Sequence, residues 1–224
     1  MIVYSEDQRI TDIIDKRDTM YPTYAVMTRT PHIVSAKEIG WATMFGFSFG
    51  NTTITVGEEE YNFEKNQYFS IPVHNEDVGL YCYSCDVFVV FRLGFIGHNL
   101  AGKQNINLPG KLSYIDGCSD SLLVYPPRLG DPSLNYLHFP ENINQSFHTH
   151  PSIRIGCVID GFGISDTTEP LELMPKTFFC LDEHELHRFR TAGSTMKIIA
   201  FHPDGDWGPT DENHTMLNRT YIKR

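Results

Sequence analysis

The sequence has little positive charge and no long apolar run. Its 224 residues include 18 Lys and Arg against 28 Asp and Glu, which gives a formal net charge of −10. Nucleic-acid backbones and anionic membrane surfaces attract concentrated Lys and Arg, so we expect neither as a partner. No run of 18 apolar residues is present, and the charged segment 1–18 lacks the apolar core of a signal peptide. These absences predict a cytoplasmic protein.

Cysteine is also scarce, and the usual nucleotide and hydrolase motifs are missing. The five cysteines are an odd number, which fits a reducing compartment. Cys82 and Cys85 form a C-x-x-C, but they lie in a strand-like run with no second pair and no helix start, so we expect no redox or zinc role. The glycines form no phosphate-binding loop between a strand and a helix, and no Ser-His-Asp set is recognisable.

Short runs of aromatic and β-branched residues dominate most of the chain. Gly, Asn, Asp and Pro separate them at short intervals, which is typical of an all-β sandwich or barrel. The clearest runs in the first half are 23–30, 42–50, 52–56, 68–73 and 86–95. The first 20 residues differ, because Ile10, Ile13 and Ile14 follow a helical spacing. That segment predicts a short helix on the barrel or an arm that contacts a partner.

Two histidines in the segment 147–161 (FHTHPSIRIGCVIDG) give the strongest chemical signal. Read as a strand, this segment turns His148, His150 and Arg154 toward one face. Imidazoles two residues apart on a strand are about 6.5 to 7 Å apart at the backbone, so both rings can converge on one ion. A second β-like run, 176–181, leads to His187, which is placed to be a third ligand from a neighbouring strand.

These residues resemble the cupin family. Its first motif is His-x-His, three or four residues, Glu, six residues, Gly, and its second has a Pro-x-Gly turn before a third His. His148, His150 and Gly161 fall on the first motif, and His187 falls on the second. The resemblance implies a cupin-type β-barrel, that is, a double-stranded β-helix or jelly roll, with a metal ion held by His148, His150 and His187.

The chain departs from the cupin motifs at two places. Arg154 stands at the glutamate position, and the Pro-x-Gly turn reads Asp182-Glu183-His184. Loss of the carboxylate resembles the three-histidine cupins, such as the gentisate, acetylacetone and thiol dioxygenases. The resemblance therefore implies one divalent ion, Fe(II) first, with Ni, Mn, Co or Zn as alternatives. It also implies an oxidoreductase that acts on a small anionic substrate, and a homodimer.

An internal comparison predicts two copies of one β-unit. A shift of 110 residues places 61–77 over 171–187 and Gly46 over Gly156. We therefore expect a bicupin with a degenerate N-terminal barrel at 1–104 and a metal-binding C-terminal barrel at 105–224, joined through the Gly- and Asn-rich segment 97–110. The first-half counterparts of the three histidines are Glu38, Gly40 and Asp77. Two carboxylates fall well short of the six to eight oxygens that Ca²⁺ prefers, so we expect no metal there.

Further residues are candidates for roles around the metal. Arg154 is predicted to clamp a substrate carboxylate, or else to form a structural ion pair with Glu183 or Glu185. Either glutamate could instead be a fourth ligand or could accept an imidazole N–H. His138 is a weaker candidate ligand, because the alternation in 133–139 gives it the parity of the barrel interior.

Three functions remain open at this point. The first is an Fe(II) dioxygenase. The second is an isomerase or lyase that uses the ion as a Lewis acid, with Tyr136, Tyr125 or Glu185 as the base. The third is a barrel that binds a ligand or assembles without turnover. The polar tail 204–224, which contains Trp207, is expected to be mobile unless it folds back to close the barrel or joins a neighbouring subunit.

Overall fold

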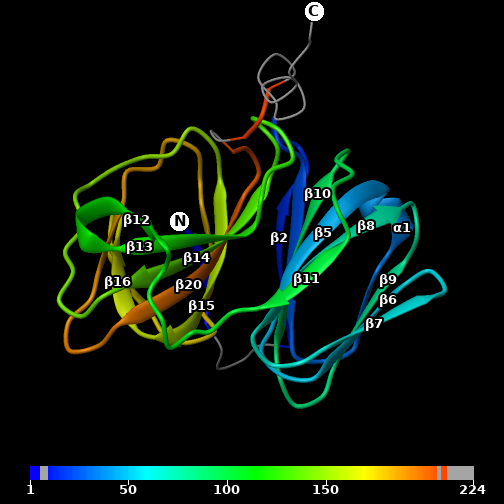
Figure 1. Cartoon of the computed structure of the whole chain (residues 1–224), viewed down its shortest axis with the longest axis horizontal. Helices are drawn as coiled ribbons and strands as arrows, with labels where there is room; N and C mark the ends of the chain where they lie inside the picture. The colour runs from blue at the N-terminus through cyan, green and yellow to red at the C-terminus, as the bar shows by residue number, and fades with distance from the viewer. Residues whose placement is uncertain (6–9, 206–207, 211–224) are drawn as a thin grey trace, which may run out of the picture.

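The computed structural model describes residues 1–5, 10–205 and 208–210. These residues form two β-barrels that lie side by side, with the first half of the chain in one barrel and most of the second half in the other (Figure 1). The strands pair antiparallel throughout. The prediction of an all-β chain with two barrels is confirmed. Trp207 and most of the tail lie outside the described residues.

The first barrel consists of a six-stranded and a four-stranded sheet, in the orders β11-β8-β5-β10-β3-β2 and β4-β9-β6-β7. Its strands are β2 (Thr11–Lys16), β3 (Thr23–Thr28), β4 (His32–Val34), β5 (Trp41–Ser48), β6 (Thr52–Val56), β7 (Glu59–Phe63), β8 (Gln67–His74), β9 (Val78–Cys82), β10 (Val87–Leu93) and β11 (Leu100–Lys103). One short helix, α1 (Ala36–Ile39), precedes β5. An apolar cluster that includes Val89, Phe91 and Phe69 fills the interior.

The second barrel repeats this arrangement, with the orders β1-β18-β15-β20-β14-β13-β12 and β17-β16-β19. Its elements are β1 (Ile2–Tyr4), β12 (Leu112–Ser113), the 3-10 turn η1 (Ile115–Gly117), β13 (Ser119–Val124), β14 (Ser133–Phe139), β15 (Arg154–Gly161), β16 (Gly163–Asp166), β17 (Pro170–Leu173), β18 (Phe178–Leu181), β19 (Arg188–Arg190) and β20 (Met196–His202). Phe139, Phe179 and Ile198 belong to its interior cluster.

Two glycines occupy the same place in the two barrels. Gly46 lies opposite Phe69 in the β5–β8 pair, and Gly156 lies opposite Phe179 in the β15–β18 pair. A Cβ on either glycine would lie within 3.0 Å of the facing phenylalanine ring. Both positions therefore need glycine because an aromatic ring covers the backbone there. Gly156 follows Gly46 by 110 residues, and Phe179 follows Phe69 by the same 110 residues, which is the shift that relates the two halves of the sequence.

The N-terminal segment forms strands, so the predicted helix is wrong. β1 pairs with β18 of the second barrel, with Ile2 opposite Cys180, and β2 pairs with β3. In β2 only Ile14 is buried, while Ile13 is exposed. The two sheet edges offer unpaired backbone groups to this segment, and the hydrogen bonds gained there outweigh a short helical pattern that buries little apolar surface.

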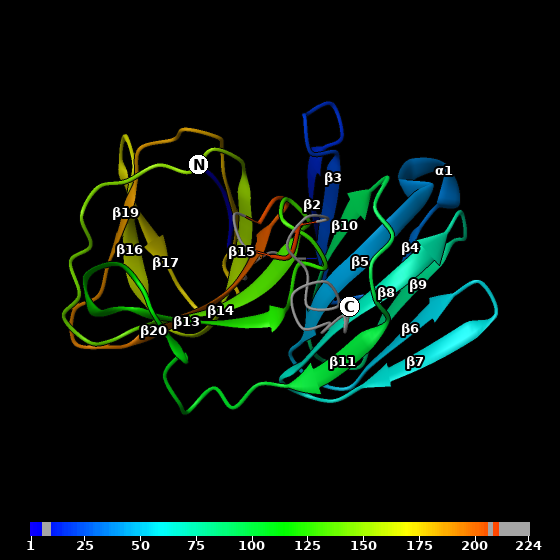
Figure 2. The same cartoon turned by 45° about the horizontal axis from the view of Figure 1, so that its top comes forward.

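The connection between the barrels is shorter than predicted. The expected crossover was 97–110, but residues 100–103 form β11, which pairs with β8 at the edge of the first barrel. The chain then passes from β11 to β12 in the second barrel (Figure 2). The crossover is therefore 104–111.

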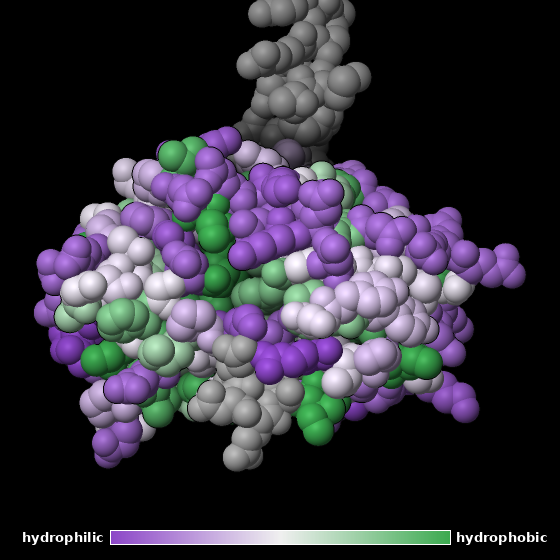
Figure 3. All heavy atoms as spheres, turned by 90° about the horizontal axis from the view of Figure 1, so that it is seen from below, coloured by the Kyte–Doolittle hydropathy of each residue, from purple (hydrophilic) through white to green (hydrophobic). Residues whose placement is uncertain are grey.

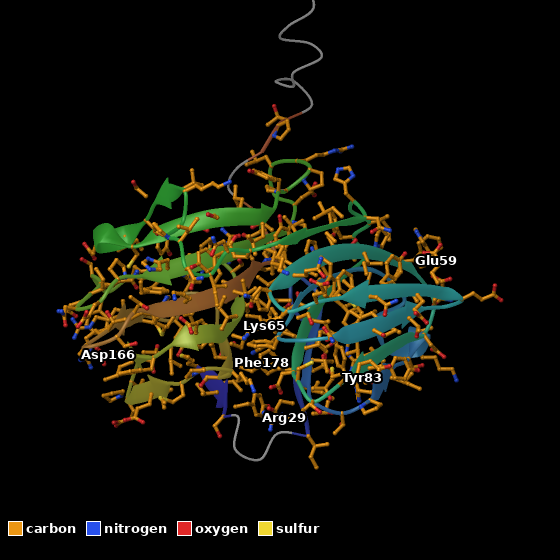
Figure 4. The ribbon with its side chains drawn as sticks, turned by 60° about the horizontal axis from the view of Figure 1, so that its bottom comes forward. Arg29, Glu59, Lys65, Tyr83, Asp166 and Phe178 are labelled. Atoms are coloured by element: carbon orange, nitrogen blue, oxygen red, sulfur yellow. The ribbon has the colours of Figure 1, made fainter. Side chains whose placement is uncertain are left out.

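The two barrels share an apolar contact and a buried ionic contact. Phe45 and Phe201, one from each barrel, have ring centroids 5.2 Å apart, and Phe178 lies in the same cluster, at the middle of the molecule in Figure 4. Asp86 is fully buried, and its carboxylate lies 3.2 Å from both Arg29 Nη2 and Lys176 Nζ. Because Lys176 comes from the second barrel, this carboxylate links the halves.

The face of the molecule seen in Figure 3 has hydrophilic residues over most of it, with apolar residues recessed in a hollow near its centre. Among the described residues, no helix has the length and apolar character needed to cross a membrane.

Candidate metal centre

His148, His150 and His187 converge at one end of the second barrel. One potential ligand atom from each side chain lies within 4.8 Å of those of the other two. The ring centroids are 5.2 Å apart for His148 and His150, 4.4 Å for His148 and His187, and 5.0 Å for His150 and His187. Ring rotations would bring one nitrogen of each imidazole to about 2.0 to 2.2 Å from a shared divalent ion. Within the described residues, this is the one such group of potential ligands.

Backbone hydrogen bonds hold the three histidines together. His148 and His187 form an antiparallel bridge, in which each N–H donates to the carbonyl of the other at 2.9 and 3.0 Å. The His150 carbonyl accepts from the His184 N–H at 2.8 Å. The segment that carries the His-x-His pair is thereby fixed to the turn that precedes β19.

Two of the imidazoles, those of His148 and His187, make the backbone hydrogen bond that is typical of metal-ligating histidines. His148 Nδ1 donates to the Ser146 carbonyl at 2.9 Å, and His187 Nδ1 donates to the Glu185 carbonyl at 2.8 Å. A proton on Nδ1 leaves Nε2 with its lone pair. The His187 Nε2 atom is buried and has no hydrogen-bond partner among the described residues. A buried nitrogen in that state is costly unless it binds something, and a metal ion fits the donor set.

Burial keeps two of the rings neutral. It lowers the pKa of His150 to about 3, with Arg154 and the other two histidines acting in the same direction. It lowers the pKa of His187 to about 4, although the bond to the Glu185 carbonyl opposes the shift. Both rings are therefore neutral at physiological pH, which is the form that coordinates a metal.

The strand that was predicted over 147–161 begins only at Arg154. Residues 149–153 are irregular, and they contain Pro151, which has no N–H to contribute to a sheet ladder. The bend brings Arg154 close enough to lower the pKa of His150, and both side chains line the same cavity. A straight strand would have separated them by about 13 Å.

Arg154 points into the barrel, as its parity predicted, but its partners differ from those expected. Its guanidinium Nη1 donates to the carbonyls of Ser152 and Ile153, to the Ser152 hydroxyl, and to Asp204 at 3.4 Å. The side chain is 10% exposed. The predicted ion pair with Glu183 or Glu185 is therefore wrong. Asp204 follows β20 and reaches Arg154 only because β15 and β20 are neighbours in the sheet.

The side chains of Glu185 and Tyr136 are engaged with partners other than the three imidazole rings. The Glu185 carboxylate forms an ion pair with the Met1 amino group and accepts from the Asp182 N–H at 2.9 Å. Tyr136 is fully buried in the cluster between the barrels, and its hydroxyl donates to the Leu108 carbonyl at 2.9 Å. Burial raises the pKa of Tyr136 to about 12. Tyr125, by contrast, is exposed and lines a cavity next to the histidines.

His138 is not part of the histidine group. It lies on β14 opposite Ser119 and Lys197, and burial together with Lys197 lowers its pKa. Its neighbour Leu137 belongs to the interior cluster, so alternation turns His138 to the outer side. The parity assigned to His138 from the sequence was therefore wrong by one residue.

The first-barrel counterparts of the histidines cap helix α1. The Glu38 carboxylate accepts from the Ser35 N–H at 3.1 Å, and Ser35 accepts in return, which completes a capping box. The Asp77 carboxylate accepts from the Ala36 N–H at 2.7 Å. Gly40 ends the helix with a φ of +54°. Both carboxylates satisfy the N-terminal backbone groups of a helix.

Sequence reasoning missed a residue that joins the two histidine segments. Gln145 is 1% exposed, and its side-chain oxygen accepts from the Phe189 N–H at 3.2 Å while its own N–H donates to the Phe189 carbonyl at 3.1 Å. Its amide also donates to Cys118 Sγ at 3.4 Å. A buried amide three residues before His148 could have been noticed, but its partners are 27 and 44 residues away.

A cavity of about 780 Å³ adjoins the centre. Arg154 lines it from β15, His202 from β20 and Asp120 from β13, and His150 lines it from the loop before β15. Lys103, from the first barrel, also contributes to the lining. His202 was not considered from the sequence; burial lowers its pKa well below the usual value, with Arg154 and His150 adding to the effect. The first barrel therefore helps to enclose the cavity.

No protein-family model and no curated protein matches the sequence. Solved structures do match the fold. A cupin 2 conserved barrel domain protein from Leptotrichia buccalis aligns with a TM-score of 0.59 at 13% identity, over 89% of this chain and 91% of that one. A putative glyoxylate induced protein from Pseudomonas aeruginosa aligns with a TM-score of 0.63 at 13% identity, over 89% and 82%.

Bacillus subtilis oxalate decarboxylase, whose structure was studied for its Mn(II) centres, aligns with a TM-score of 0.56 at 7% identity, over 93% of this chain and 78% of that one. At these identities the likeness concerns the arrangement of the strands. The double barrel of this chain, which carries a three-histidine group in its second half, has the fold of the cupin proteins.

Proposed function

We propose that the chain is a metal-dependent cupin enzyme, a non-haem Fe(II) dioxygenase that acts on a small anionic metabolite. The observation that supports this most is the buried Nε2 of His187, which faces two further imidazoles and has no hydrogen-bond partner among the described residues. Three neutral imidazoles leave the double positive charge of a divalent ion intact, which favours an anionic, chelating substrate.

His148, His150 and His187 would hold the ion. When bound, Fe(II) supplies the electron transfer that lets dioxygen react with an organic substrate. A dioxygenase places both oxygen atoms in the product, and the substrate provides the electrons. The chain's own contribution is to keep the His150 and His187 imidazoles neutral, to receive the substrate in the cavity, and to place the Arg154 guanidinium near His150 as a positive charge that attracts an anionic group.

The first barrel, within residues 1–104, is proposed to be a degenerate copy that holds no metal. The capping roles of Glu38 and Asp77 support this, because each carboxylate already accepts a backbone N–H of α1. The second barrel, within residues 105–224, would then carry the centre, with β1 added to its sheet.

A second candidate is a cupin isomerase or lyase in which the ion is a Lewis acid. Of the bases considered for it, Tyr125 lines the cavity, whereas Tyr136 and Glu185 are engaged elsewhere. Oxygen uptake separates the two reactions, because only the dioxygenase consumes O2 in proportion to product.

Metal content tests the centre itself. Protein expressed without a histidine tag should contain one Fe, or another divalent ion, per chain. His148→Ala and His187→Ala should each remove it, whereas Asp77→Ala should retain it. Equal loss in all three variants, or a wild-type protein that binds no metal from an iron, manganese, nickel, cobalt or zinc solution, would contradict the proposal and leave a non-catalytic binding barrel.

A further inference from the structure

One carboxylate inside the second barrel has no role in the proposed metal centre. Asp120 lies on β13 directly opposite Leu137 of β14, and directly opposed residues point to the same face of a sheet. Leu137 belongs to the interior cluster, so the Asp120 side chain also faces the interior. It lines the cavity of about 780 Å³ that reaches His150.

The Asp120 carboxylate is only half satisfied. Asn135 Nδ2 donates to Oδ2 at 2.7 Å, and the Asn135 oxygen accepts from the Ser133 hydroxyl at 2.9 Å. Asp120 Oδ1 is buried and accepts no hydrogen bond of normal geometry from the described residues. A chain of two side chains thus holds one oxygen in place and leaves the other open, which is costly unless a ligand supplies a donor.

No Lys or Arg of the described residues forms an ion pair with the Asp120 carboxylate. Arg154 is engaged with Asp204 and with backbone carbonyls, and Lys103 pairs with Glu64 at 3.1 Å. Burial raises the pKa of Asp120 to about 6, against the opposing effects of the Asn135 amide and the Ser121 N–H. Burial and the Asp120 charge together raise the pKa of Tyr114 to about 12, so the phenol stays protonated. A carboxylate that forms no ion pair among the described residues and lines a ligand-sized cavity is a candidate binding site.

We propose that Asp120 is the specificity-determining group of this cavity and binds an ammonium group of the ligand. The ligand class is therefore a small amine, which under the proposed function also carries the anionic group that the metal centre favours. This inference goes beyond the proposed function and does not require a bound metal, because Asp120 belongs to β13 and the three histidines do not.

Probe binding tests the proposal. Butylammonium chloride and sodium butanoate, matched in length and ionic strength, are titrated into metal-free protein and followed by ligand-observed NMR. Asp120→Asn keeps the shape and the contact with Asn135 but removes the charge, and should weaken butylammonium binding at least tenfold while butanoate binding is unchanged or tighter. Asp18→Asn, an exposed site in a turn, is the matched control and should change neither.

The pH dependence of the wild type provides a second measurement, for the case that Asp120→Asn fails to fold. With a pKa of about 6 for Asp120, the ionised fraction falls about tenfold between pH 7.5 and pH 5, so butylammonium should bind about tenfold more weakly at pH 5. The charged and titratable groups around the same cavity are Tyr114, Lys103, Lys111, Arg154, Asp204, His150 and His202.

The outcomes are distinct from those for the metal centre. Asp120→Asn should retain the metal, so a loss of metal in His187→Ala bears on the proposed function alone. Equal weakening of both probes by Asp120→Asn would indicate a change of cavity shape and overturn the proposal. Butylammonium affinity that does not change between pH 7.5 and pH 5 would overturn it as well.

Discussion

Replacement of Gln145 by alanine should weaken both the fold and the metal centre. In the wild type the Gln145 side-chain oxygen accepts from the buried Phe189 N–H, two residues after His187. Without that acceptor the N–H loses its partner, at a cost of about 1 to 3 kcal/mol. A loss of about 2 kcal/mol in a chain of this size lowers the melting temperature by about 4 to 8 °C.

The same contact helps to hold the two histidine segments together. The Gln145 backbone and side chain both bind the backbone of Phe189, so they fix the segment before His148 against the one that follows His187. Loss of a residue that positions metal ligands typically costs 10- to 100-fold in metal affinity. We expect at least a tenfold loss for Gln145→Ala, measured by competition with a chelator at a temperature well below the melting point.

Gln67→Ala is the matched control. The Gln67 side-chain oxygen also accepts a backbone N–H, that of Glu64, but in the first barrel at a more exposed position. It should lower the melting temperature less and leave metal affinity unchanged. If Gln145→Ala lowers the melting temperature as expected but binds metal like the wild type, Gln145 stabilises the barrel without positioning the ligands, and the reasoning is refuted.

Two further predictions concern pH and packing. The folded pKa of His187 is about 4, below the value of about 6.5 for an unfolded chain, so the metal-free protein should lose stability as pH falls through this window. Protonation of His187 should lower the free energy of unfolding by about 2 kcal/mol between pH 7.5 and pH 5. Denaturant unfolding of the wild type and of His187→Gln at the two pH values measures this loss. An equal loss in both proteins would contradict the prediction. Gly156→Ala should destabilise the protein by about 1 to 3 kcal/mol in the same assay, because the added Cβ would lie 2.7 Å from Phe179 Cζ and 3.0 Å from the Ile199 carbonyl; a neutral result would show that the ring moves aside.

The sequence alone indicated most of the strands and the group of three histidines. Alternation and turn residues are local, so runs such as 42–50 and 86–95 could be read as strands, and the His-x-His spacing could be read as two ligands on one segment. The shift of 110 residues aligned Gly46 with Gly156. Both copies keep glycine there because a phenylalanine ring covers the backbone at that position. Local patterns failed at the N-terminus, where sheet edges elsewhere in the fold supply the hydrogen bonds.

Tertiary structure decided the surroundings of the histidines. Arg154 pairs with Asp204, Glu185 with the Met1 amino group, and Tyr136 with the crossover backbone, and none of these partners is close in sequence. Asp120 is a candidate binding residue only because the closed barrel places its side chain in the cavity that His150 also lines. The physical reason is that the alternation of a strand fixes the face on which a side chain lies, whereas the order of strands in the closed sheet fixes what it meets there.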